Sequence, residues 1–151
     1  KIFPMLTGMA PSDPLWRILV WPRRRAIVAI MIWISSWMMI LGLVAMAAFP
    51  TFAVHGAHIY YIGGVSLMIF AVATRVGLAH GGHGLAMERR SWVLIAILVF
   101  LGIALLTRVS APWFPKVYNS HLAYAAMAWI LAAICWGMAL LPKLWCRKSA
   151  G

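Results

Sequence analysis

The chain has 151 residues, of which 65% are hydrophobic and only 10% are charged. Soluble domains are nearer to about 45–50% apolar and about 25% charged, so this composition excludes a soluble globular fold and indicates an integral membrane protein. The net charge is +11, with Asp13 and Glu88 as the two acidic residues. Because the basic residues flank apolar segments, they are typical of topology signals and of contact with anionic lipid, and nucleic-acid binding is the poorer interpretation.

Four apolar segments are each long enough to cross a hydrocarbon layer of about 30 Å, which takes about 20 helical residues. They span approximately residues 26–49, 58–78, 91–107 and 120–141. We therefore expect an all-α fold, an integral membrane four-helix bundle that occupies residues 23–148. Pro50 and Pro142 are expected to end the first and the fourth helix, because proline cannot continue the backbone ladder. Residues 51–57 are expected to form a short loop.

The ends of the segments carry unequal numbers of basic residues. One side of the membrane collects the bases at 23–25, at 89–90 and after residue 142, whereas Arg108 and Lys116 fall on the other side. The positive-inside rule then places the N- and C-termini in the cytoplasm. The preceding segment, 1–22, is expected to be interfacial, with a short helix over residues 15–21 whose tryptophans lie at headgroup level. The alternative is a poorly ordered N-terminal tail.

Five histidines stand out in a chain so poor in polar residues: His55, His58, His80, His83 and His121. In the expected topology the first two and His121 lie toward the outer face, and His80 and His83 toward the cytoplasmic face. Imidazole is a ligand for haem iron and for copper. Two imidazoles that hold one haem must approach it from opposite sides, and His58 and His121 meet this requirement if the second and fourth helices are neighbours.

Other assignments of these side chains stay open. His55 and His58 together with His121 are suited to copper, and His80 and His83 are suited to copper or to one axial position each. An interfacial histidine is also often only a polar residue at headgroup level. Arg75, one turn inside the second span, either snorkels to the interface or pairs with a haem propionate or with Glu88.

No catalytic constellation is present in the sequence. Two acidic residues give no paired carboxylates, and no serine lies in a nucleophile-type motif. We therefore expect no independent catalytic activity.

The stretch HIYYIGGVSLMIFAVATRVGLAHGGHG, which begins at His58, resembles the C-terminal region of the NnrS family. The positions that match the family pattern are His58, Gly63, Thr74, Arg75, Leu78, His80 and Gly82. LLTRVSAP around Arg108 and Trp129 in the last span extend the resemblance over about residues 57–145. Family members have more spans than the four expected here, so the chain resembles a shortened relative or the C-terminal part of one.

The resemblance implies a haem- and copper-containing membrane protein linked to nitric oxide tolerance in denitrifying bacteria. It therefore implies a multi-pass protein of the bacterial inner (cytoplasmic) membrane. It also implies that His58 and His80 are ligand candidates and that Arg75 is a propionate or structural partner. The lipid bilayer and other membrane subunits are the expected partners.

Three functions remain open at this point. The first is an NnrS-like membrane subunit that binds haem b, with copper as a further candidate, in nitric oxide tolerance or electron transfer. The second is a di-haem b-type quinol cytochrome, which needs facing histidines at both membrane faces and finds them only at the outer one. The third is a cofactor-free accessory subunit of a larger membrane complex, which the small-residue faces at 123–128 and at Gly63-Gly64 would suit.

Overall fold

The structure, a computed structural model, describes residues 22, 26–80 and 91–145. His83, Glu88 and nearly all of the expected interfacial segment 1–22 lie outside the described residues. Within these ranges every regular element is helical, and η2 is a π-helix whereas the other η elements are 3-10 turns. The elements are α3 (Ile27–Ala48), η1 (Pro50–Phe52), α4 (Ala53–His58), η2 (Ile59–Ser66), α5 (Leu67–His80), α7 (Trp92–Ser110), η3 (Ala111–Trp113), η4 (Pro115–Val117) and α8 (Tyr118–Trp145).

Four helical segments are long and apolar enough to cross a membrane. They are Ile27–Ala48, Pro50–His80, Trp92–Trp113 and Pro115–Lys143. The two shortest have 22 residues each, which corresponds to about 33 Å of α-helix and matches the hydrocarbon thickness. The chain is therefore an all-helical, multi-pass membrane protein, as the composition predicts.

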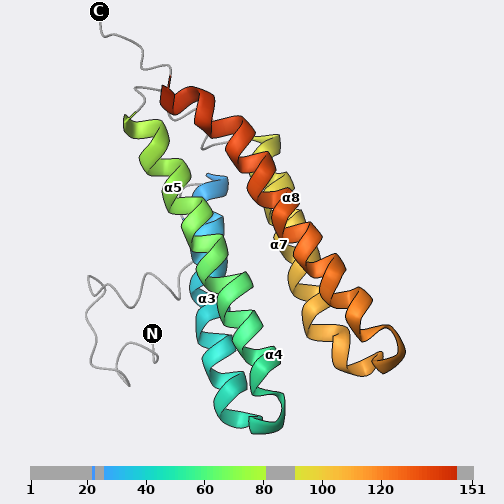
Figure 1. Cartoon of the computed structure of the whole chain (residues 1–151). Coiled ribbons are helices and arrows are strands. Elements are labelled where there is room, and N and C mark those ends of the chain that lie inside the picture. Colours follow the sequence, from blue (N-terminus) through green and yellow to red (C-terminus); the bar gives the residue numbers. More distant parts are fainter. Residues whose placement is uncertain (1–21, 23–25, 81–90, 146–151) are drawn as a thin grey trace, which may run out of the picture.

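The four spans form two helical hairpins (Figure 1). In the first hairpin, α3 packs along the second span, which runs continuously through α4, η2 and α5; in the second hairpin, α7 packs along α8. The second span also joins the two hairpins, because α4 and η2 contact α7 whereas α5 contacts α8. We call the end with the α3–α4 and α7–α8 connections the hairpin end, and the other end the terminal end.

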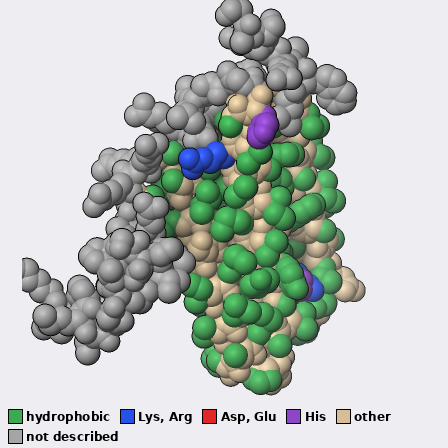
Figure 2. Space-filling model, turned by 90° about the vertical axis from the view of Figure 1, so that its left-hand side faces the viewer, with side chains coloured by type: hydrophobic (Ala, Val, Ile, Leu, Met, Phe, Trp, Pro, Cys, Tyr) green, Lys and Arg blue, Asp and Glu red, His purple; other side chains and the backbone are tan. Residues whose placement is uncertain are grey.

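The best-packed core lies toward the terminal end and takes side chains from all four spans. Its buried members are Val28, Met31, Leu67, Phe70, Ala71, Leu94, Ile97, Leu101 and Ala132. Large apolar side chains also cover the outside, where Leu106 is 70% exposed and Met138 is 67% exposed. Figure 2 shows hydrophobic side chains over most of one face of the bundle. An apolar outer surface of this extent is suited to hydrocarbon rather than to water.

Glycines bring α3 and the second span close together. A Cβ on Gly42 would lie 2.6 Å from the backbone nitrogen of Tyr60, and one on Gly63 would lie 3.1 Å from Cγ of Met38. Gly64 is equally tight against Met39. Small residues allow such backbone contact between membrane helices, so the expected close approach at Gly63-Gly64 is confirmed.

Two boundaries differ from the sequence expectations. Residues 51–57 are not a loop: they lie in η1 and α4, because Pro50 occupies the first turn of the new helix, where no backbone N–H is needed. Pro142 does not end the fourth helix, since α8 continues to Trp145. A proline this close to a helix end removes only one backbone hydrogen bond, and the last turn forms beyond it.

Candidate functional site

The described histidines lie at two ends of the bundle. His55 and His58 lie on α4 and His121 lies in the first turn of α8, so all three are at the hairpin end. His80 is the last residue of α5, at the terminal end, one turn beyond Arg75. The three at the hairpin end are half-buried, whereas His80 and Arg75 are exposed. His83 lies outside the described residues.

Two of the ligand candidates share one local geometry. Nδ1 of His58 lies 2.5 Å from the carbonyl oxygen of Val54, and Nδ1 of His80 lies 2.9 Å from that of Val76, each four residues earlier on the same helix. A carbonyl only accepts hydrogen bonds, so Nδ1 carries the proton and donates it. In a neutral imidazole this leaves Nε2 with a free lone pair, the arrangement in which histidine binds a metal.

His121 reaches the same state through tertiary contacts. Its Nδ1 lies 3.3 Å from the carbonyl oxygen of Thr107 and 3.4 Å from Oγ of Ser110, both on the last turn of α7. The ring of Phe114 stacks on the imidazole with 5.5 Å between ring centroids. Thr107 and Ser110 thus meet the ring at Nδ1 and Phe114 covers one of its faces, and Nε2 is again the nitrogen without a hydrogen bond among the described residues.

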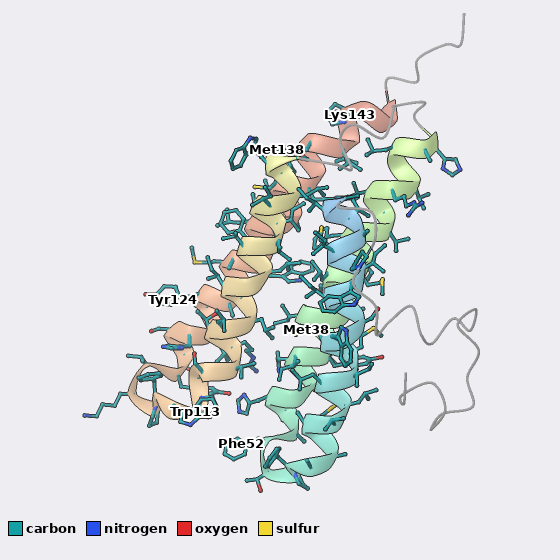
Figure 3. All side chains as sticks on the ribbon, turned by 180° about the vertical axis from the view of Figure 1, so that it is seen from behind. Met38, Phe52, Trp113, Tyr124, Met138 and Lys143 are labelled. Atoms are coloured by element: carbon teal, nitrogen blue, oxygen red, sulfur yellow. The ribbon has the colours of Figure 1, made fainter. Side chains whose placement is uncertain are left out.

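His55 differs from the other three described histidines. Its Nδ1 is buried and has no hydrogen-bond partner within the described part of the chain. Its ring lies 6.1 Å from that of Phe52, which in turn stacks on Trp113 with 6.4 Å between centroids. Figure 3 shows Phe52 and Trp113 side by side at the hairpin end, one from each hairpin. His55 is therefore next to an aromatic contact that links the two hairpins.

The described residues do not gather three metal-binding side chains. No group of three or more His, Cys, Asp or Glu side chains is placed to hold one metal ion among residues 26–80 and 91–145. The copper site expected from His55, His58 and His121 is thus not assembled in this arrangement. At the level of α4 the neighbouring helix is α7, and the second and fourth spans meet mainly through α5.

Near Arg75, a buried polar contact joins the second and fourth spans. Thr74 is fully buried; its hydroxyl donates to the carbonyl oxygen of Phe70 at 2.6 Å and accepts from Nε1 of Trp136 at 3.1 Å. Closer to the hairpin end, Nε1 of Trp129 donates to Oγ of Ser66 at 3.2 Å. Sequence reasoning singled out Thr74 and Trp129 only as family matches and missed these contacts, because their partners lie more than sixty residues away.

Comparison with known proteins decides the family. The model of the NnrS protein family matches residues 4–148, which is nearly the whole chain. The chain belongs to the NnrS family. This match reaches well beyond the resemblance seen over about residues 57–145, and it includes the first span. Searches of the curated proteins and of the solved structures found no match. Within this NnrS chain, the histidines at the hairpin end and the Arg75–His80 turn are the candidate site residues.

Proposed function

We propose that this NnrS family membrane protein binds haem b at the hairpin end through His58 and His121, and serves nitric oxide tolerance or electron transfer. The observation that carries the proposal is the hydrogen bonding of Nδ1, which in both residues meets a backbone carbonyl. Such a bond sets the tautomer and the orientation of an imidazole and raises the basicity of Nε2. The two residues lie on different spans, as two-sided ligation of one haem requires, although the helix next to α4 is α7 and the second and fourth spans meet mainly through α5.

His80 and Arg75 form a second part of the proposal, at the terminal end. His80 has the same Nδ1–carbonyl contact as His58, and Arg75 is exposed and suited to a propionate or to snorkelling. A haem here would draw only one axial imidazole from the described residues. The di-haem quinol cytochrome is therefore the less favoured form of the proposal.

The haem would supply an iron centre that binds a diatomic gas or passes one electron. The role of the protein would be to hold and orient that centre and to keep water away from it. Phe114 covers one face of the His121 ring, and the apolar helix faces around the hairpin end suit a site of low polarity.

Copper is a weaker part of the proposal. His55 supports copper binding, because its Nδ1 is buried and has no hydrogen-bond partner within the described residues. A buried polar atom of this kind normally has a partner, which a metal ion would supply. The described residues bring no third donor to it. Metal analysis of the protein decides whether copper is present.

We also propose that both termini face the cytoplasm of a bacterial inner membrane. The distribution of basic residues supports this orientation: Arg108 and Lys116 flank the hairpin end, whereas more bases flank the terminal end.

The test is an optical spectrum of the purified full chain, oxidised and then reduced with dithionite, with iron and copper analysis of the same sample. The proposal expects Soret and α bands on reduction and iron in proportion to the protein. A folded, colourless, metal-free sample would overturn it. That result would favour the alternative, a cofactor-free accessory subunit whose exposed α8 face packs against other membrane subunits.

A further inference from the structure

A half-buried arginine lies beside the candidate ligand His121. Arg108 directly follows Thr107, whose carbonyl oxygen accepts from His121 Nδ1. The guanidinium of Arg108 donates to the phenol oxygen of Tyr118 at 3.5 Å, across the α7–α8 connection. The imidazole and the guanidinium are therefore held at the same turn of the hairpin end.

The guanidinium has no acidic partner in the part of the chain that the structure describes. Residues 26–80 and 91–145 contain no Asp or Glu at all, so within these ranges the guanidinium donates to a neutral phenol instead. A guanidinium that is hydrogen-bonded to a neutral phenol keeps further donors that an anion can meet. Its planar fork presents five donors and matches a carboxylate in a bidentate manner.

The other basic residues near the candidate sites are placed differently. Arg75 is exposed on α5 at the opposite end of the bundle, where solvent and headgroups reach it. Lys116 is exposed on η4 at the hairpin end. Among these three, Arg108 is the cation that is both half-buried and attached to the turn that holds His121.

We propose that Arg108, held by Tyr118, binds a carboxylate of the tetrapyrrole whose iron His121 ligates. The proposal rests on the proposed function and adds a residue to it: Arg108 is the propionate partner of a haem at the hairpin end, whereas Arg75 lies at the terminal end. Haem b carries two propionates, and Arg108 lies in the last turn of α7, at an end of the span where charge is tolerated.

Titration of the full chain with two tetrapyrroles tests this inference. The protein is purified from haem-deficient cells into phosphatidylcholine nanodiscs and titrated with haem and with haem dimethyl ester, in which both carboxylates are blocked. We expect the wild type to bind haem about 10- to 100-fold more tightly than the ester, the effect of one charge-assisted bidentate pair. Arg108→Gln should lose most of this preference by weakening haem binding and leaving ester binding unchanged.

Two control variants separate the carboxylate contact from general effects. Lys116→Gln removes a nearby exposed charge and should keep the full preference for haem. Arg108→Lys keeps the charge without the planar fork and should retain part of it. Circular dichroism of each variant verifies that the helices are intact.

Three outcomes would overturn the inference, and each has its own meaning. If Arg108→Gln keeps the full preference, Arg108 does not bind the carboxylate. If the preference of the wild type vanishes in phosphatidylglycerol nanodiscs, the headgroup of an anionic lipid is the anion that Arg108 binds. If the wild type binds neither haem nor its ester, the proposed function itself has failed.

Discussion

Two indole–hydroxyl pairs set the position of α8 against the second span. The pair Trp136–Thr74 is the more sheltered, because Thr74 is fully buried, whereas Ser66 in the pair with Trp129 is half-buried. The ring of Phe70 lies between the two indoles, 6.3 Å from Trp129 and 5.8 Å from Trp136. In hydrocarbon such hydrogen bonds stabilise helix contacts by about 0.6–2 kcal/mol. They therefore fix which faces of the two hairpins meet.

The Trp136–Thr74 pair gives the first prediction. Trp136→Phe removes the indole donor, and Thr74→Val removes the hydroxyl, so each should lower the free energy of unfolding by about 1–2 kcal/mol. Because both variants delete one interaction, the double variant should cost less than the sum. Equilibrium unfolding in mixed micelles measures all three. Strict additivity would show that the hydrogen bond contributes nothing.

The hydrogen-bond partners of the candidate ligands could be predicted from the sequence only in part. The sequence indicates the histidines and the ends at which they lie, and the Nδ1 contacts of His58 and His80 follow from a helix alone, since each partner is four residues earlier. The partners of His121 come from the preceding span, eleven and fourteen residues away. The chain turns back through η3 and η4 between these residues, so only the packed hairpin shows the contacts.

The π-helix η2 and the glycines around it determine how closely the two spans of the first hairpin pack. Ile59–Ser66 follows His58 directly and contains the buried pair Gly63-Gly64. A π-helical stretch turns the faces of the residues on either side of it relative to one another, and it is often found at functional sites. Hydropathy predicts that a span is present here, but it carries no information on this change of helix type. Hydropathy also does not show that the second span starts early, at η1 and α4.

Gly42 gives a prediction at this scale. A Cβ there would meet the backbone of Tyr60 at 2.6 Å, and backbone atoms cannot rotate away as a side chain can. Gly42→Ala should therefore force α3 and η2 apart and destabilise the protein by about 1–3 kcal/mol.

Gly102→Ala is the matched control for that variant. Gly102 is also helical, and nothing lies within 4 Å of its Cβ position. Its replacement should be neutral or stabilise by up to about 1 kcal/mol, since alanine is the better helix former. Thermal unfolding of the two proteins in the same detergent compares them. Equal melting temperatures would contradict the close approach at Gly42.

The whole molecule consists of two hairpins that share a core at the terminal end and meet at the hairpin end through the Phe52–Trp113 stack. The composition was enough to predict a membrane protein, since a charged fraction of 10% leaves no alternative to membrane burial, and the lengths of the apolar segments predicted the four spans. The way the hairpins cross was not predictable, because apolar side chains cover the lipid-facing and the packed sides of each span alike.

The proposed orientation gives a prediction for the whole molecule. In a chain with Cys135 and Cys146 replaced by serine, Lys116→Cys should react with a membrane-impermeant thiol reagent added to intact cells. Lys143→Cys should react only after the inner membrane is permeabilised, because it lies at the terminal end. The reverse pattern would place the termini outside the cytoplasm.

The most direct test of the central claim, that His121 and His58 hold a haem, is the reduced spectrum of three histidine variants purified in parallel. His121→Ala and His58→Ala should lose or shift the α and Soret bands, and added imidazole should restore them in part by entering the vacated position. His55→Ala should keep the wild-type spectrum, since its Nδ1 has no carbonyl partner within the described residues to orient the ring. Wild-type bands in both His121→Ala and His58→Ala would contradict the account.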